Sequence, residues 1–126
     1  MIGLCCGYTF TFSSTMYLGL SSTAINTSGS GITEPDVSSG YQRCAIAMNQ
    51  SNWSQPLNGI IMNKNVIAMS EIEIAYGYVN YWFLSASING TAKIYNQLSE
   101  PYLLDSNTRV YVYPNELKFG INNVIL

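Results

Sequence analysis

Apolar and polar residues alternate with a period of two through most of this 126-residue chain, and helical periodicity is nearly absent. In residues 8–12, YTFTF, three aromatic side chains would share one face of a strand while the threonines take the other. In residues 70–76, SEIEIAY, apolar residues alternate with Glu71 and Glu73, which is typical of a strand with one wet face. The pattern therefore predicts an all-β fold.

A hairpin is the most specific local structure that the sequence predicts. Residues 79–88, VNYWFLSASI, are apolar on both faces, as in a central strand packed on two sides. The pair Asn89-Gly90 then precedes another strand-like run, TAKIYNQL, and both residues of the pair tolerate positive φ, which predicts a type I′ turn. Pro101 and Pro114 are expected at strand ends, because proline cannot donate to an interior ladder. Further strands are expected at residues 16–20, 41–48, 65–69, 109–113 and 116–120.

Two longer segments interrupt these short strands. Residues 21–40 are small, polar and rich in Gly and Ser, and residues 49–59 carry Trp53 and Pro56. No internal repeat divides the chain, and its length suits one domain. We expect a single-domain antiparallel β-sandwich over residues 1–126, jelly-roll or Greek-key-like, with two long loops. Residues 1–15 would form a short N-terminal arm or an edge strand.

The composition excludes several classes of function. The chain contains no histidine, so Ser-His-Asp, Cys-His and HExxH chemistry is excluded. Five basic residues stand against seven acidic ones, which argues against binding to nucleic acid or to an anionic membrane. No apolar run approaches a membrane span, and the N-terminus lacks the pattern of a signal peptide. Three cysteines, an odd number, indicate reduced thiols in a protein assembled in a cytoplasm.

No arrangement of residues predicts catalysis. Glu71 and Glu73 would project from the same strand face, where solvated charges are a better interpretation than a glycosidase pair. Glu34 and Asp36 flank Pro35, but calcium would need more oxygen ligands than this loop supplies. The segment SGSGI lacks the lysine of a phosphate-binding loop. We therefore expect no catalytic residue, no metal and no cofactor.

Tyrosine is the one abundant residue type with a possible role at a surface. Ten tyrosines exceed what the core of a domain this small needs, and tyrosine combines a rigid apolar ring with a polar tip. An interface or a glycan-contacting surface is therefore a hypothesis, with packing of the sheet as the alternative for most of these rings. The loop 21–40 is either a contact with a neighbouring protein or a mobile surface loop. The candidate interface residues are Trp53, Tyr76, Tyr78, Tyr102, Tyr111, Tyr113, Glu34 and Asp36.

The order of motifs from Met16 onward resembles a family of small tailed-bacteriophage virion proteins, of the tail-fibre or head-fibre-like kind. The resemblance rests on YLGLSSTA, on GSGITEPDVSSGYQRCAI with Gly40, Tyr41 and Arg43 in the expected places, and on NVIAM, YWFLSAS, KIYNQL and RVYVYPNELKFGIN. Ser39 replaces a glycine of the family pattern, and the short N-terminus replaces a helical lead-in.

The resemblance implies a non-enzymatic virion structural protein, made in the bacterial cytoplasm and located on the particle. It would be an oligomerising β-module of the tail or fibre apparatus, or a capsid-attached fibre or decoration. Its partners would be other virion proteins and copies of itself. The alternative is a module that binds a glycan or receptor on the host surface, and a Glu-dependent glycosidase is a weaker third hypothesis.

Overall fold

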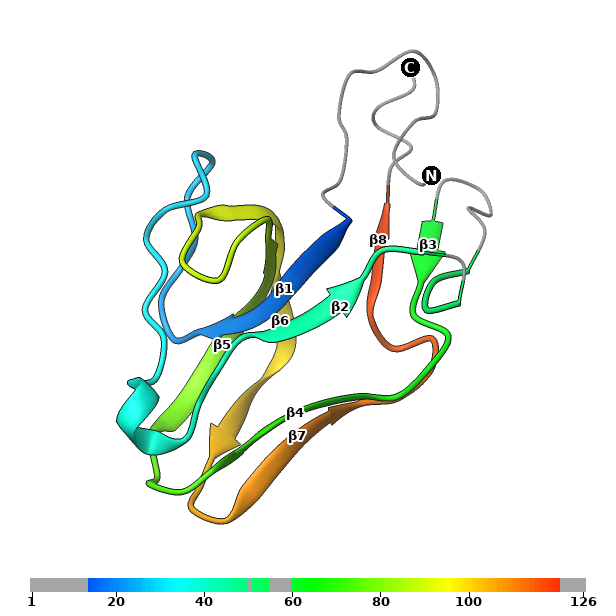
Figure 1. The fold of residues 1–126 in the computed structure, drawn as a ribbon. Helices are drawn as coiled ribbons and strands as arrows, with labels where there is room; N and C mark the ends of the chain where they lie inside the picture. The colour runs from blue at the N-terminus through cyan, green and yellow to red at the C-terminus, as the bar shows by residue number, and fades with distance from the viewer. Residues whose placement is uncertain (1–13, 50, 55–59, 121–126) are drawn as a thin grey trace.

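A computed structural model describes residues 14–49, 51–54 and 60–120, and these fold almost entirely into antiparallel strands (Figure 1). The predicted strand 8–12, Cys5 and Cys6 lie outside the described residues. The elements are β1 (Thr15–Ser21), the 3₁₀ turn η2 (Val37–Ser39), β2 (Cys44–Ala47), β3 (Ile60–Met62), β4 (Ile67–Ile72), β5 (Gly77–Ser85), β6 (Ala92–Leu104), β7 (Thr108–Val112) and β8 (Lys118–Gly120). No helix in these ranges is long and apolar enough to cross a bilayer.

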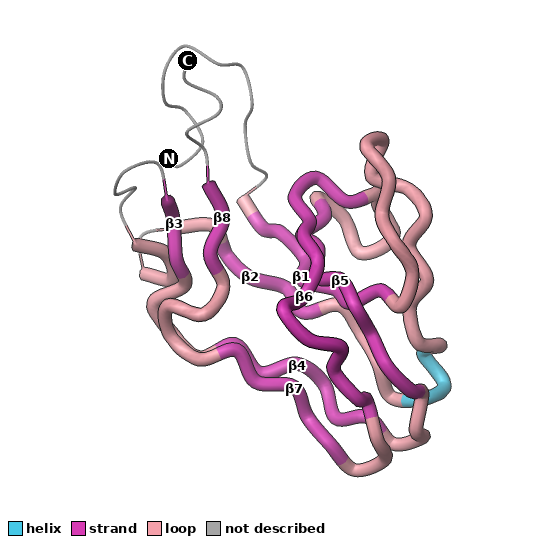
Figure 2. The backbone as a smooth tube through the Cα atoms, turned by 180° about the vertical axis from the view of Figure 1, so that it is seen from behind, coloured by secondary structure: helices cyan, strands magenta, loops and turns pink. Residues whose placement is uncertain are grey.

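The strands form one four-stranded sheet and two two-stranded ribbons. The sheet has the order β2-β1-β5-β6, and the ribbons pair β4 with β7 and β3 with β8. Seen from either side, the β4–β7 ribbon lies across the sheet and the β3–β8 ribbon stands beside its end (Figures 1 and 2). This arrangement confirms the prediction of an all-β, sandwich-like antiparallel fold.

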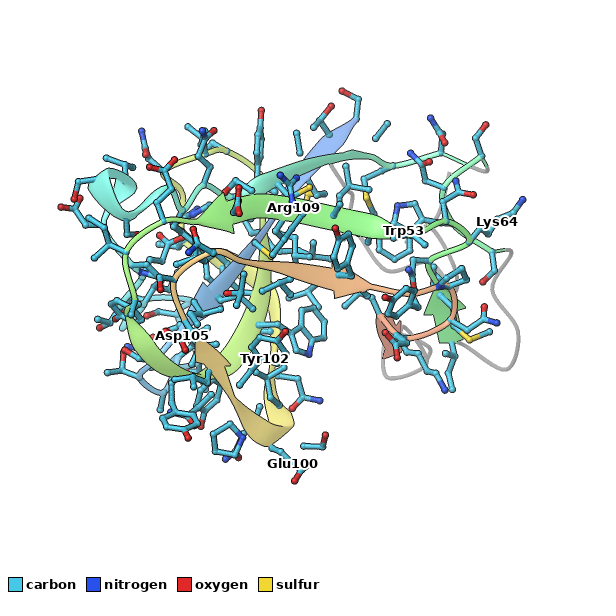
Figure 3. All side chains as sticks on the ribbon, turned by 90° about the horizontal axis from the view of Figure 1, so that it is seen from below. Trp53, Lys64, Glu100, Tyr102, Asp105 and Arg109 are labelled. Atoms are coloured by element: carbon cyan, nitrogen blue, oxygen red, sulfur yellow. The ribbon has the colours of Figure 1, made fainter. Side chains whose placement is uncertain are left out.

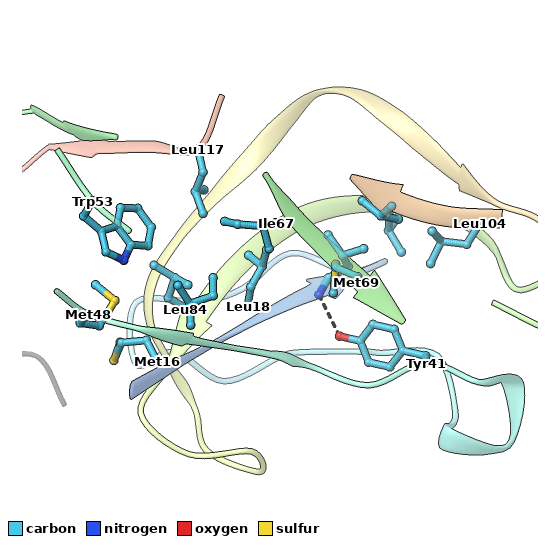
Figure 4. Close-up of a cluster of buried hydrophobic side chains, with 14 of the residues drawn as sticks. Met16, Leu18, Tyr41, Met48, Trp53, Ile67, Met69, Leu84, Leu104 and Leu117 are labelled. Carbon is cyan, nitrogen blue, oxygen red and sulfur yellow. Dashed lines mark hydrogen bonds between the residues drawn. The ribbon is translucent and has the colours of Figure 1, made fainter. Parts of the chain in front are cut away.

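The main hydrophobic core fills the space between the sheet and the ribbons (Figure 4). Leu18 and Leu84 come from the sheet, Met69 comes from β4 and Ile61 comes from β3, and all four are buried. Burying one such side chain contributes roughly 1.5–3 kcal/mol. These side-chain contacts therefore hold the two ribbons against the sheet, with which neither ribbon shares a backbone ladder.

The opposite face of the sheet is covered by the long loop that follows β1. Ile25 and Ile32 from this loop pack with Phe83 and Ala92 in a second, smaller cluster. Phe83 and its neighbour Leu84 are both fully buried, one on each face. The expected central strand packed on two sides is therefore confirmed for β5.

The β5–β6 hairpin is confirmed, but the predicted type I′ turn at Asn89-Gly90 is wrong. The strands are joined by residues 86–91, and neither Asn89 nor Gly90 has positive φ. The loop closes instead through a bond from Gly90 N to Ser87 O of 3.2 Å. The reason is a long-range contact: the Arg43 guanidinium donates to Ser87 O at 3.2 Å and to Gly90 O at 2.8 Å.

Pro101 lies inside β6, so its expected place at a strand end is wrong. The ladder pairs Tyr81 with Gln97 and Val79 with Tyr102, so β6 carries three residues more than β5 between these two pairs. Such a bulge leaves residues out of the ladder, and proline is tolerated there. Pro114 follows β7 and lies between strands, as predicted.

The region around β4 differs from the predicted alternation. Separate strands were expected at residues 65–69 and 70–76, but the single strand β4 covers Ile67–Ile72. Ile74, which the alternation would place on a buried face, is 58% exposed. The alternation stops because the backbone N–H groups of Glu73 and Ile74 donate to Ser39 O in η2 instead of continuing a ladder. Strand β3 was not predicted, because its three residues are too short for a periodic pattern.

Candidate functional site

Trp53 lies in the main core and does not contribute to the surface. Its side chain is 1% exposed, and it packs close to Met16 and Met48 (Figure 4). Its backbone forms an isolated bridge with Asn63. The expected exposed interface role is therefore not available to Trp53 in this fold.

Glu34 is engaged in a partly buried ion pair with Arg43. The Arg43 guanidinium binds it with two nitrogens, from Nη2 to Oε2 at 2.8 Å and from Nε to Oε1 at 3.0 Å. The Tyr41 hydroxyl donates to the same Oε1 at 2.6 Å and accepts from Leu20 N at 3.0 Å. Burial, and next the hydrogen bond to Glu34, raise the pKa of Tyr41 far above its usual range. Glu34 thus fastens the loop over the sheet rather than meeting a partner.

Asp36 is exposed, but its polar atoms organise the η2 turn. Its carboxylate accepts from Ser38 Oγ at 2.9 Å, and its carbonyl accepts from Ser39 N at 3.0 Å. Val37, which follows it, is 75% exposed. Of the two predicted acidic contacts, only Asp36 therefore remains at the surface.

Tyr76 and Tyr78 lie near the end of the sheet where β5 begins. Tyr76 is half-buried against the core, with its hydroxyl 3.1 Å from Ser22 Oγ. Tyr78 is 59% exposed and stands opposite Leu103, itself exposed, in the β5–β6 ladder. Ile74 is exposed close by in the chain. Ile74, Tyr78 and Leu103 form what we call the apolar end.

Tyr111 and Tyr113 lie on the outward face of the β4–β7 ribbon. Their rings stack, with centroids 6.2 Å apart and an interplanar angle of 22°. Both are about half exposed, as is Val66, which precedes the Ile67–Val112 pair of the ladder. We call the surface formed by Val66, Tyr111 and Tyr113 the ribbon face; Figure 3 views the molecule from the side on which this ribbon lies.

A groove of about 560 Å³ opens between β6 and β7. Leu18, Leu20 and Met69 of the core contribute to its floor, together with half-buried Trp82. Its walls are Gln97, Leu98, Ser99 and Tyr102 of the bulged strand on one side, and Val110, Tyr111 and Val112 on the other, with residues 115–118 at one end. The structure therefore brings together Tyr102 and Tyr111 of the predicted candidates, and Tyr113 stacks on Tyr111.

Trp82, Gln97 and Lys118 line the groove but were not predicted as site residues. Trp82 was assigned to a central strand, and the sequence carries no signal that one side of this strand opens to solvent. The wall at residues 115–118 is held by buried Asn63, whose Oδ1 accepts from Leu117 N at 2.9 Å and whose Nδ2 donates to Tyr113 O at 3.0 Å.

The groove offers apolar contacts, amide groups and strand edges. Its one carboxylate, Glu116, accepts from Tyr113 N at 2.8 Å. Glu71 and Glu73 lie elsewhere and are exposed, with Glu71 opposite Arg109 in the β4–β7 ladder. In the described ranges no three His, Cys, Asp or Glu side chains gather as metal ligands. A smaller depression of about 190 Å³ lies between β2 and β4.

Comparison with known proteins places this fold and surface in a biological context. No curated protein matches the chain. A family model described as "Podophage GP4 fiber I protein gp80" matches residues 3–120, which is nearly the whole chain. The match confirms the expected relation to tailed-phage virion fibre proteins. The chain therefore belongs to the family of the podophage GP4 fiber I protein gp80 and is a structural fibre protein of the phage virion.

Proposed function

We propose that residues 1–126 act as one non-enzymatic module of the fibre that associates with copies of itself and with neighbouring virion proteins. Association would follow synthesis in the bacterial cytoplasm. The observation that carries the proposal is the ribbon face, where Tyr111 and Tyr113 stack while both are about half exposed. Tyrosine is enriched at the centres of protein interfaces, because its ring buries a large area at a small cost in conformational entropy.

The charges of the chain support the same proposal. Charged residues make up only 10% of the sequence, and Glu34 and Arg43 are already paired within the protein. A surface poor in charge gives little protection against association. We therefore expect self-association to depend on apolar burial and to change little with salt, since screening acts on exposed charges.

The test is the oligomeric state of the full chain, measured by analytical ultracentrifugation across micromolar concentrations and from low to high salt. The double substitution Tyr111→Ser and Tyr113→Ser is expected to shift the protein to a smaller species without changing its urea midpoint. Tyr78→Ser is the matched control, because Tyr78 is equally exposed but belongs to the apolar end. A wild-type protein that stays monomeric would overturn the proposal.

Binding of a host-surface glycan is the second candidate function, favoured by the groove. Trp82 and Tyr102 provide aromatic faces there, and Gln97 and Asn115 provide amide groups. Aromatic faces with a few polar groups are common in ligand sites. Titration with host cell-wall oligosaccharides, followed by Trp82 fluorescence with Trp82→Phe as the control, tests this candidate. An unchanged emission spectrum across the titration contradicts it.

A further inference from the structure

The groove between β6 and β7 is bordered by two strands that each lack a second partner. β6 pairs with β5 alone, and β7 pairs with β4 alone, among the strands of the described ranges. Edge strands present N–H and C=O groups that can pair with another strand. An extended segment placed between two such edges gains main-chain hydrogen bonds as well as side-chain contacts.

The floor of the groove specifies what kind of segment fits. Leu18, Leu20, Met69 and Trp82 are apolar, so one face of an incoming strand must be apolar as well. Side chains of a strand point alternately to its two faces, so large apolar residues are needed at every second position. The other face of the strand would meet solvent and should be polar.

The chain carries a segment with this pattern. Residues 8–12 read Tyr-Thr-Phe-Thr-Phe, with three aromatic residues at alternate positions and threonines between them. The first charged residue of the sequence is Glu34, so no charge would enter the groove with this segment. The described part of the chain begins at Ser14, whose carbonyl accepts from Met48 N at 2.9 Å beside the start of β1.

The proposed association of copies decides which copy supplies the segment. Among the described strands, β1 pairs with β2 and with β5, whereas the edges that border the groove belong to β6 and β7. A segment supplied by a neighbouring copy would join two molecules through this groove.

We propose that residues 8–12 of one copy dock as an extended strand in the β6–β7 groove of a neighbouring copy. This inference rests on the proposed function, because it names the segment and the surface through which the copies associate. The aromatic residues Tyr8, Phe10 and Phe12 would pack on Trp82 and the leucines of the floor.

The experiment uses the full chain with one change on each side of the contact. The arm variant carries Phe10→Asp and Phe12→Asp, and its control carries Thr9→Asp and Thr11→Asp, which place the same charge on the opposite face. The groove variant carries Gln97→Arg, and its control carries Asn96→Arg, the neighbouring exposed residue that does not line the groove. Sedimentation gives the mass, and the urea midpoint verifies that each variant is folded.

The expected result is loss of the oligomer for the arm variant and for the groove variant, with both controls assembling like the wild type. A mixture of the two variants should then form heterodimers, because one intact arm can meet one intact groove. Assembly of both variants at wild-type strength overturns the inference and leaves the proposed function standing. A monomeric wild type overturns the proposed function itself. The inference is also overturned if both variants are folded but their mixture stays monomeric. It is likewise overturned if an oligosaccharide binds in the groove and residues 8–12 do not.

Discussion

The guanidinium carbon of Arg43 lies 4.8 Å from the centre of the Phe83 ring, on the face of the sheet that the long loop covers. The same guanidinium binds Glu34 in the loop and donates to Ser85 Oγ at 2.8 Å. It also reaches the carbonyl groups in the β5–β6 turn. One side chain thus fastens the loop, the sheet and the hairpin turn to one another.

Arg43→Met is expected to lower the free energy of unfolding by about 3–5 kcal/mol, because it leaves the Glu34 carboxylate partly buried without its cation. Arg43→Lys should recover only part of this loss, since an ammonium group cannot reproduce the forked hydrogen bonds. The control is Arg109→Met, which removes an exposed cation opposite Glu71 and should cost about 1 kcal/mol or less. Urea unfolding measures all three, and equal costs for Arg43 and Arg109 would contradict the assignment.

Gly19→Ala is expected to destabilise the protein, although alanine in a strand is usually better than glycine. Gly19 pairs with Phe83 across β1 and β5, and an added methyl group would fall on the end of the Phe83 ring. Overpacking of this kind costs about 1–3 kcal/mol, whereas an unhindered site would gain roughly 0.5–1 kcal/mol. The sign of the change in the urea midpoint therefore distinguishes overpacking against Phe83 from an unhindered site. Phe83→Leu in the same chain should reduce the penalty, because the two sites are in contact.

The raised pKa of Tyr41 is expected to lower the stability of the protein at high pH. Its pKa is raised in the folded protein, by burial first and then by its hydrogen bond to Glu34, whereas the unfolded value is about 10. The folded state therefore holds a proton that the unfolded state loses above that pH. The stabilisation that Tyr41 gives the folded state is fully present below about pH 10 and is lost as the pH rises further. The free energy of unfolding then falls by at most about 1.4 kcal/mol per pH unit.

The measurement is urea unfolding of wild type and Tyr41→Phe between neutral and strongly alkaline pH. The two proteins share the other nine tyrosines, so the difference between their curves isolates Tyr41. Tyr41→Phe should be less stable at neutral pH, since Leu20 N and Glu34 lose a partner, and the gap should narrow above about pH 10. A gap that stays constant with pH would show that Tyr41 ionises alike in both states.

Local periodicity was sufficient to predict most of the fold. The ends of β1 and β7 fall within one residue of the predicted runs and those of β5 within three, because each run buries apolar side chains on at least one face in the structure. The failures arise where a distant group replaces local preference. Arg43 shapes the turn at Asn89-Gly90, Ser39 ends β4, and the bulge accommodates Pro101 inside β6. None of these contacts can be predicted from the local sequence pattern.

The candidate site was harder to predict than the fold. The abundance of tyrosine correctly indicated more aromatic residues than the core holds, because Tyr78, Tyr102, Tyr111 and Tyr113 are all exposed. Composition cannot show that Trp53 is buried under the β3–β8 end, or that Trp82 lies in a groove. The groove depends on the absence of pairing between β6 and β7, which is a property of the sheet order and not of either strand.

Asn63→Ala tests whether the wall of the groove takes part in association. Asn63 is 1% exposed, and its side chain holds Leu117 N, Tyr113 O and Asn65 O. Removing it should cost about 3 kcal/mol, because these buried groups lose their partner.

The matched control is Asn65→Ala, whose exposed side chain bonds to Ser51 O and Asn52 Oδ1 and should cost about 1 kcal/mol. Hydrogen exchange at the Leu117 amide is expected to quicken only in Asn63→Ala. Because Tyr113 and Leu117 flank the groove, the loosened wall should also weaken self-association of the folded protein. Loss of stability with unchanged association would place the contact between copies away from residues 113–118.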